Sequence, residues 1–237
     1  MSVVKDLLFP RRCPVCGDIV QPERALICPS CIPKLSPVRQ PACRKCGKEV
    51  FAEHVEYCQD CSRHRRTFDS GAALLNYNET ARTSMAAIKY KNKREYLDFY
   101  AEAMNHRFGK LAASWCPDVL VPVPVHPSRR RSRGFNQAEE LAKRLSVHWE
   151  IPVDSALLIR SKKTAPQRDL SAAERLNNLQ EAFVLQPSRQ DGPIPGCVIL
   201  IDDIYTTGST IEACARILKQ AGVQKIHFLT ICIGGGR

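Results

Sequence analysis

One stretch of the chain carries the clearest structural information: Val198-Ile-Leu-Ile-Asp-Asp-Ile-Tyr-Thr-Thr-Gly-Ser-Thr210. Its first four residues are aliphatic, so we expect a buried strand over 198–201. Two adjacent carboxylates, Asp202 and Asp203, follow that strand, and a polar loop with one glycine comes next. A helical pattern then covers 209–221. The order of strand, loop and helix predicts one unit of a parallel sheet that is covered by helices.

The same stretch has the groups that bind a sugar phosphate. The carboxylates of Asp202 and Asp203 can accept hydrogen bonds from the two hydroxyls of a ribose. Backbone N–H groups at a helix start attract a phosphate, and hydroxyl side chains add further donors. The residues expected to hold the phosphate are Thr206, Thr207, Gly208, Ser209 and Thr210. A buried strand that ends in a turn before an ordinary capped helix is the alternative, but it does not require two adjacent acids.

A second polar cluster lies between residues 118 and 137, where a strand expected over 119–125 runs into a proline-stiffened turn and an arginine-rich loop. Arginine makes bidentate contacts with phosphate groups, and a glycine lets the backbone approach them closely. The alternatives are a solvated basic loop and a nucleic-acid patch. The residues expected to face a pyrophosphate are Pro124, Val125, His126, Arg133 and Gly134.

A third polar cluster follows a short strand expected over 156–160. It reads as a mobile loop that becomes a helix near 171–180, with Ser171 as the N-cap. Such a loop can close over a bound diphosphate as a lid, although an ordinary polar connection is the alternative. The expected lid residues are Lys162, Lys163, Thr164 and Gln167.

Eight of the twelve cysteines form four C-x-x-C knuckles whose first cysteines are spaced every 15 residues. A knuckle supplies two thiolates from one tight turn, and two knuckles complete a tetrahedral zinc site without an open position. We therefore predict two structural Zn²⁺ ions, and four regular knuckles argue against redox dithiols. Sequential and cross-braced pairing of the knuckles both remain open. The expected ligands are Cys13, Cys16, Cys28, Cys31, Cys43, Cys46, Cys58 and Cys61.

The composition is that of a folded, basic protein. Among 237 residues, 44% are hydrophobic, which is enough for a packed core and argues against disorder. The formal charge of +11 falls to about +7 when two zinc ions and eight thiolates are included, and this favours anionic ligands such as phosphates or nucleic acid. No run is long enough to span a bilayer, and residues 1–12 lack the apolar stretch of a signal peptide. We expect a cytoplasmic protein.

Two domains are predicted. Residues 1–66 contain the knuckles, several prolines and little periodic pattern, which is typical of a module held together by metal. Residues 67–237 alternate strands with helices, which predicts an α/β domain with a parallel sheet and helices on both faces. Beyond the elements already named, strands are expected over 68–77 and 225–233, and helices over 80–90, 95–115 and 136–149.

The stretch from Val198 to Thr210 closely resembles the phosphoribosyl-pyrophosphate (PRPP) signature of type I phosphoribosyltransferases. The chain as a whole resembles the ComF competence proteins of bacteria and the related GntX proteins, in which a zinc-binding region precedes a phosphoribosyltransferase domain. The resemblance covers nearly the whole chain. Besides the knuckles and the signature, the matching pieces are Arg82…Ile88-Lys-Tyr90, Pro122-Val-Pro-Val-His126, Arg133-Gly-Phe-Asn-Gln137, Thr164-x-x-Gln167 and Arg175-x-x-Asn178.

The resemblance implies a type I phosphoribosyltransferase fold and binding of PRPP together with Mg²⁺. It assigns Asp202 and Asp203 to the ribose hydroxyls and the magnesium shell as catalytic residues, with an unknown acceptor for the phosphoribose. The family is linked to DNA uptake. The alternative is therefore a non-catalytic factor that handles single-stranded DNA, or that docks on a DNA-uptake helicase or another competence protein, with PRPP as a regulator. The hood that selects the acceptor base in type I enzymes would have to come from the zinc module or from 68–115, or be absent.

Overall fold

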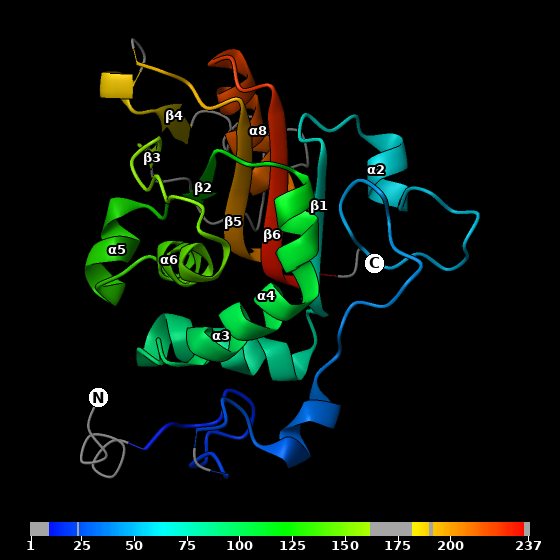
Figure 1. Cartoon of the computed structure of the whole chain (residues 1–237), viewed down its shortest axis with the longest axis vertical. Helices are drawn as coiled ribbons and strands as arrows, with labels where there is room; N and C mark the ends of the chain where they lie inside the picture. The colour runs from blue at the N-terminus through cyan, green and yellow to red at the C-terminus, as the bar shows by residue number, and fades with distance from the viewer. Residues whose placement is uncertain (1–9, 23, 162–181, 190–191, 235–237) are drawn as a thin grey trace, which may run out of the picture.

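A computed structural model describes residues 10–22, 24–161, 182–189 and 192–234 (Figure 1). Its centre is a four-stranded sheet in the order β1-β6-β5-β2, and each neighbouring pair is parallel. The strands are β1 (Ser70–Asn76), β2 (Val119–Pro122), β5 (Cys197–Tyr205) and β6 (Lys225–Ile233). The predicted α/β class with a parallel sheet is confirmed.

Helices cover both faces of the sheet. One face of the sheet packs on α3 (Glu79–Lys91), α4 (Tyr96–Ser114) and α6 (Gln137–Trp149) in a single apolar cluster. The other face packs on α8 (Ser209–Gln220), which lies behind the sheet in the view of Figure 1. All strand residues of β5 except Ile204 are buried, as expected for a central strand of a parallel sheet. None of the helices in the described ranges is long and apolar enough to cross a bilayer.

Three local predictions need correction. The arginine-rich loop is a helix, α5 (Pro127–Arg133), which begins with His126 as N-cap and ends at Gly134 in the left-handed region, with φ 79°. Strand β5 continues through the acid pair to Tyr205, so the two acids lie within the strand and not beyond its end. A small antiparallel pair, β3 (Leu158–Arg160) and β4 (Phe183–Leu185), adds a strand that was not expected. The helix expected over 171–180 lies outside the described residues.

The cysteine knuckles form two ribbons with very short elements, η1 (Pro29–Lys34) and α2 (Gln59–Arg63). We call residues 11–35 the first ribbon and residues 41–63 the second ribbon. The first ribbon lies below α3 in Figure 1, and the second lies beside β1. A last short turn, η3 (Pro187–Arg189), precedes β5.

Candidate functional site

The eight knuckle cysteines gather into two groups of four. One group contains Cys13, Cys16, Cys28 and Cys31, and the other contains Cys43, Cys46, Cys58 and Cys61. Within each group all four sulfurs lie within 4.8 Å of one another. Neighbouring knuckles therefore pair in sequence, which excludes the cross-braced alternative.

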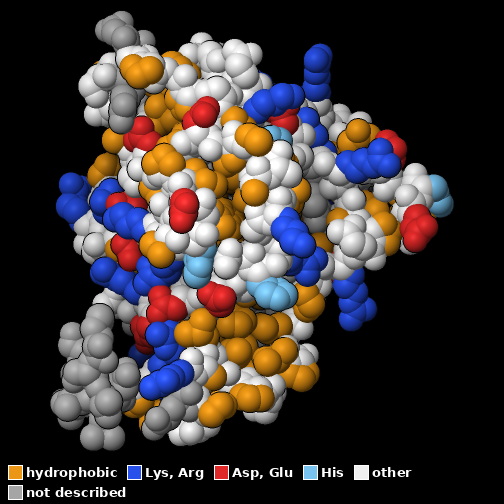
Figure 2. All heavy atoms as spheres, viewed as in Figure 1, with side chains coloured by type: hydrophobic (Ala, Val, Ile, Leu, Met, Phe, Trp, Pro, Cys, Tyr) orange, Lys and Arg blue, Asp and Glu red, His pale blue; other side chains and the backbone are white. Residues whose placement is uncertain are grey.

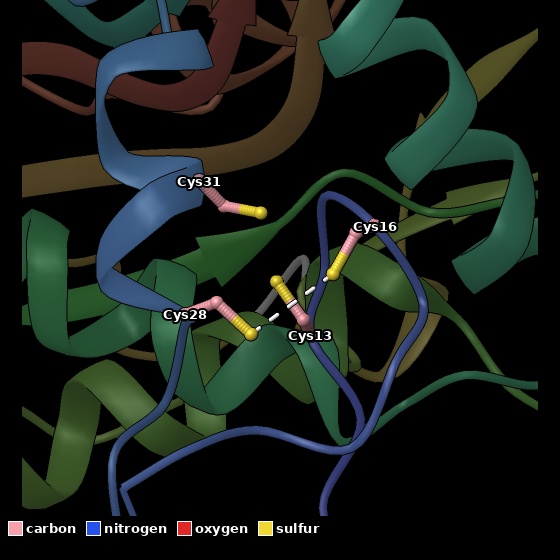
Figure 3. A group of neighbouring side chains, drawn as sticks. All are labelled: Cys13, Cys16, Cys28 and Cys31. Carbon is pink, nitrogen blue, oxygen red and sulfur yellow. Dashed lines mark hydrogen bonds between the residues drawn. The ribbon is translucent and has the colours of Figure 1, made fainter.

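The groups fit zinc. Figure 3 shows the four side chains of the first group pointing toward one another from a loop and from η1. The Sγ atoms of Cys16 and Cys28 are 4.0 Å apart, and those of Cys46 and Cys58 are 3.6 Å apart. A tetrahedral ion with Zn–S bonds of about 2.3 Å separates its sulfurs by about 3.8 Å. Both sites offer four thiolates and no open position, so both are structural.

The acid pair lies at the carboxyl edge of the sheet. Asp202 is 9% exposed and Asp203 is 5% exposed. Asp203 forms an ion pair with Lys89 of α3, and its Oδ1 accepts a hydrogen bond of 3.2 Å from Nε2 of Gln137 in α6. The backbone N–H of Asp203 donates to Oδ1 of Asp202 at 2.8 Å. Three elements that are distant in sequence therefore meet at these two carboxylates.

The environment shifts the pKa values of the two acids in opposite directions. Burial, reinforced by the charge of Asp203, raises the pKa of Asp202 well above its ordinary value. Burial also acts to raise the pKa of Asp203, but the charge of Lys89 and its hydrogen bond outweigh burial, so the pKa of Asp203 is lowered. For Lys89, burial opposes the charged form, but Asp203 outweighs it and raises the pKa. Of the two carboxyl groups, Asp203 therefore has the lower pKa.

The 206–210 segment follows β5 and opens α8. Gly208 is the N-cap of α8 in the left-handed region, with φ 77°, where a side chain would be strained. Within the described residues, no side chain caps the first turn of α8. The hydroxyls of Thr207 and Ser209 lie 2.9 Å apart at the exposed surface. This arrangement of free N–H groups and hydroxyls is suited to an anion.

The predicted pyrophosphate residues lie beside the acid pair. Pro124, Val125 and His126 connect the end of β2 to α5, and β2 pairs with β5 through Pro122 and Ile201. Arg133 ends α5, and its Nη1 donates to Oε1 of Gln137 at 3.1 Å. Because the amide of Gln137 also contacts Asp203, it connects Arg133 to the acid pair. The exposed Gly134 follows Arg133 and ends the helix.

Two residues of the site were missed from sequence. Lys89 and Gln137 both belong to the matching pieces of the family resemblance, but the sequence pattern assigns neither of them a role. Lys89 is four residues after the buried Met85, on the apolar side of its helix. A lysine in that position indicates a buried anionic partner, and this was the available signal. Gln137 directly follows Asn136, the N-cap of α6, where no pattern distinguishes it from a structural residue.

The side chain of Tyr90 is also close to the site. The guanidinium of Arg133 lies 5.2 Å from the ring centroid of Tyr90, which is otherwise largely exposed. Burial and the charge of Arg129 lower the pKa of Arg160 in β3, while the charge of Asp202 opposes that shift. The expected lid residues Lys162, Lys163, Thr164 and Gln167 lie outside the described residues, so the lid remains a prediction.

Comparison with known proteins identifies both parts of the chain. Residues 4–62 match the family model "Double zinc ribbon domain", and residues 90–237 match "Phosphoribosyl transferase domain". Competence protein ComFC of Bacillus subtilis is 30% identical over 208 residues, which cover 83% of this chain and 79% of that protein.

Two further relatives align over most of the chain. Competence protein F of Haemophilus influenzae is 29% identical over 92% of this chain and 95% of its own length. DNA utilization protein YhgH of Escherichia coli is 27% identical over 80% of this chain and 83% of its own length. The chain therefore belongs to the ComF family, in which a double zinc ribbon precedes a phosphoribosyltransferase domain.

Proposed function

We propose that the carboxyl edge of the sheet binds PRPP with Mg²⁺ and transfers its phosphoribosyl group to a nitrogen acceptor. One observation carries the proposal: two buried carboxylates near the end of β5 are followed, after a short loop, by an uncapped helix N-terminus. Carboxylates are suited to a diol, and an uncapped N-terminus is suited to a phosphate. A 5-phosphoribosyl group presents both, separated by a single sugar ring.

Each part of the site has a role in this proposal. Asp202 and Asp203 accept hydrogen bonds from the ribose hydroxyls, and the 206–210 segment holds the 5′-phosphate. Residues 124–134 face the pyrophosphate, with Arg133 as the cation that Gln137 orients. Lys89 keeps Asp203 ionised within a buried setting.

The reaction breaks the bond between C1 of the ribose and the pyrophosphate oxygen and forms a bond from C1 to the acceptor nitrogen. Positive charge develops on the sugar ring, as in glycoside chemistry, and negative charge leaves with the pyrophosphate. The protein would therefore act by positioning the reactants and stabilising the departing anion. In this proposal the basic residues of α5, Arg129, Arg130, Arg131 and Arg133, face that anion.

Magnesium fits the donor set of the acid pair. Mg²⁺ prefers oxygen ligands and keeps several waters, so it typically binds through one or two carboxylates and the substrate phosphates. Asp202 and Asp203 are two adjacent carboxylates at the proposed ribose position. When bound, the ion would neutralise charge on the pyrophosphate.

Calorimetric titration of the zinc-loaded protein with PRPP, with and without Mg²⁺, tests the proposal. We expect binding that requires Mg²⁺ and that disappears in the Asp202→Asn/Asp203→Asn variant, while the zinc content stays at two ions per chain. Retained binding in the double variant would show that the carboxylates are not the ribose ligands. If binding is found, release of pyrophosphate in a screen of nitrogen acceptors tests turnover.

A second role, contact with single-stranded DNA, is favoured by the names of the relatives and by one surface. Lys and Arg side chains, mixed with acidic ones, gather over α5 and α6 at the left of Figure 2. Arg129 and Arg131 on α5 are exposed, whereas Arg130 pairs with Glu139. A phosphate-backbone mode predicts an affinity for DNA that falls steeply with salt. An interaction that is absent or insensitive to salt would reject this role and leave docking on a protein of the uptake machinery as the alternative.

A further inference from the structure

The second ribbon is attached directly to the central sheet. A Cβ placed on Gly47, in the third knuckle, would lie 2.8 Å from both the Cα of Ala72 and the carbonyl oxygen of Gly71 in β1. A Cβ on Gly71 would in turn lie 2.1 Å from the ring of Phe228 in β6. No side chain fits at either position without displacing its neighbours, so the metal knuckle packs closely on β1, and β1 packs closely on the ring of Phe228.

This packing continues to the 206–210 segment. The rings of Phe228 and Tyr205 are stacked, with centroids 4.8 Å apart and planes within 3°. A Cβ on Gly208 would lie 2.2 Å from the hydroxyl oxygen of Tyr205, so the tyrosine forms the floor of the segment. Tyr205 belongs to the same buried cluster as Cys46 and Cys58 of the second zinc site. The floor of the expected phosphate site and the second zinc site are therefore parts of one core.

Arg66 and Thr67, which follow the second ribbon, also form hydrogen bonds with the 206–210 segment and with the helix that it opens. Nη2 of Arg66 donates to the carbonyl oxygen of Thr207 at 3.0 Å. The backbone N–H and hydroxyl of Thr67 donate to the carboxylate of Glu212 at 2.9 and 2.6 Å. Glu212 lies in the first turn of α8 and is 1% exposed. Two consecutive residues thus fix the middle of the segment and the start of its helix.

The first ribbon makes a different attachment. Nη1 of Arg11 pairs with Asp98 of α4 at 2.7 Å, and the apolar residues of this ribbon pack on Phe99. These contacts lead to α4, which carries none of the expected ligand-binding residues. Both ribbons are thus attached through an arginine, but only the arginine next to the second ribbon contacts the expected phosphate site.

We propose that the second ribbon is a structural wall of the 5′-phosphate site and that Arg66 is a positioning residue for that phosphate. This rests on the proposed function. Arg66 acts through the carbonyl of Thr207, because that contact sets the direction in which the N–H groups of the 206–210 segment point. The expected pyrophosphate residues 124–134 lie in the link that follows β2 and in α5 with its caps, and in this proposal they do not depend on the contact of Arg66 with Thr207.

The matched variants Arg66→Ala and Arg11→Ala, titrated with ribose 5-phosphate and with inorganic pyrophosphate, test the proposal. We expect Arg66→Ala to weaken ribose 5-phosphate binding about tenfold, the loss of one charge-assisted hydrogen bond, and to leave pyrophosphate affinity within about twofold. Arg11→Ala should leave both affinities unchanged, and Arg66→Lys should recover part of the loss. Zinc content should remain two per chain in all three. Equal losses for both ligands, or no loss for ribose 5-phosphate, would overturn the proposal.

Hydrogen exchange separates this proposal from the proposed function. If the wild-type protein binds neither ligand, the proposed function fails. The amides of residues 206–212 then decide the positioning role without any ligand. Faster exchange of these amides in Arg66→Ala than in Arg11→Ala supports the proposed role of Arg66 and the second ribbon. Equal exchange in the two variants rejects that role.

Discussion

The first ribbon buries a small apolar cluster of its own beside α4, whereas three cysteines of the second ribbon belong to the core beneath the sheet. Their local geometry is nearly the same: Gly17 N–H donates to the carbonyl of Cys13 at 2.9 Å, and Gly47 N–H donates to that of Cys43 at 2.8 Å. Their surroundings are not, because Cys16 is exposed and the equivalent Cys46 is 1% exposed. The repeated cysteine motif therefore specifies the geometry of the metal ligands. The residues that pack around each ribbon determine how much of the protein's stability depends on its metal site.

The largest expected loss of stability comes from removing a zinc ligand of the second ribbon, and removing the equivalent ligand of the first ribbon is the matched control. Cys46→Ser should lower the stability of the whole domain by about 4 kcal/mol or more, a fall in Tm of roughly 10 °C, because the metal holds a wall of the main core. Cys16→Ser should change the main transition by less than about 1 kcal/mol, since its ribbon buries only a satellite cluster. Calorimetry together with zinc analysis measures both. Equal falls in Tm for the two variants would mean that the main core depends equally on both ribbons.

A second prediction concerns the α3 side of the site, where Lys89 of α3 pairs with Asp203. Lys89→Met should cost about 3 kcal/mol, because it leaves the buried carboxylate of Asp203 without its cation. Denaturant unfolding measures the loss. Adding Asp203→Asn to Lys89→Met should restore much of the stability, since residue 203 then no longer carries a buried charge without its cation. If the single variant is neutral, the ion pair does not decide the charge of Asp203.

A smaller effect is expected at the anchor of the first ribbon. The carboxylate of Asp98 forms ion pairs with Nη1 of Arg11 and Nε of Arg144, both at 2.7 Å. All three side chains are at least a quarter exposed. Asp98→Ala should therefore cost no more than about 1 kcal/mol. Limited proteolysis should nevertheless cleave the first ribbon faster, while the second stays protected. Cleavage of both ribbons at the same rate would contradict the difference between them.

The smallest effect is expected for Tyr205→Phe. The hydroxyl of Tyr205 is buried and has no hydrogen-bond partner among the described residues. Removing it should be neutral or should stabilise the protein by up to about 1 kcal/mol, because an unsatisfied polar group is lost and the ring stack is kept. Thermal unfolding measures this change. A clear loss of stability would show that the hydroxyl supports the 206–210 segment through a water or another partner.

The sequence was sufficient for features that depend on local pattern. The strand and the helix start around residues 198–210 were predicted, because an aliphatic run favours a buried strand and a glycine favours a turn before a helix. The acid pair was identified as well, although it lies within the strand and not after it. The two zinc sites were predicted from spacing alone. The α5 helix was not, because Pro127–Arg133 has no apolar residue to show a period. Its caps, His126 and Gly134, mark its ends, but they also fit a loop.

Features that depend on long-range packing could not be predicted in the same way. The pair of Lys89 with Asp203 joins residues 114 positions apart, and no local pattern names the partner. The two ribbons have the same 15-residue spacing, so nothing in that pattern tells the attached ribbon from the separate one. The glycines that differ in their surroundings, Gly17 and Gly47, have almost equal φ angles of 80° and 75°. Only the contacts of Gly47 reveal its position against β1.

The strand order has a consequence for how the protein folds during synthesis on the ribosome. Each zinc site closes within a short segment near the N-terminus, so both can capture metal early in synthesis. By contrast, β1 pairs with β6, and Ser70 meets His227 across 157 residues. Such non-local pairing is slow, and it cannot begin until the last strand has been translated. The apolar face of the metal-loaded second ribbon therefore stays exposed to solvent until β6 has been made. Chains truncated before β6 are expected to keep their zinc and to aggregate through that face.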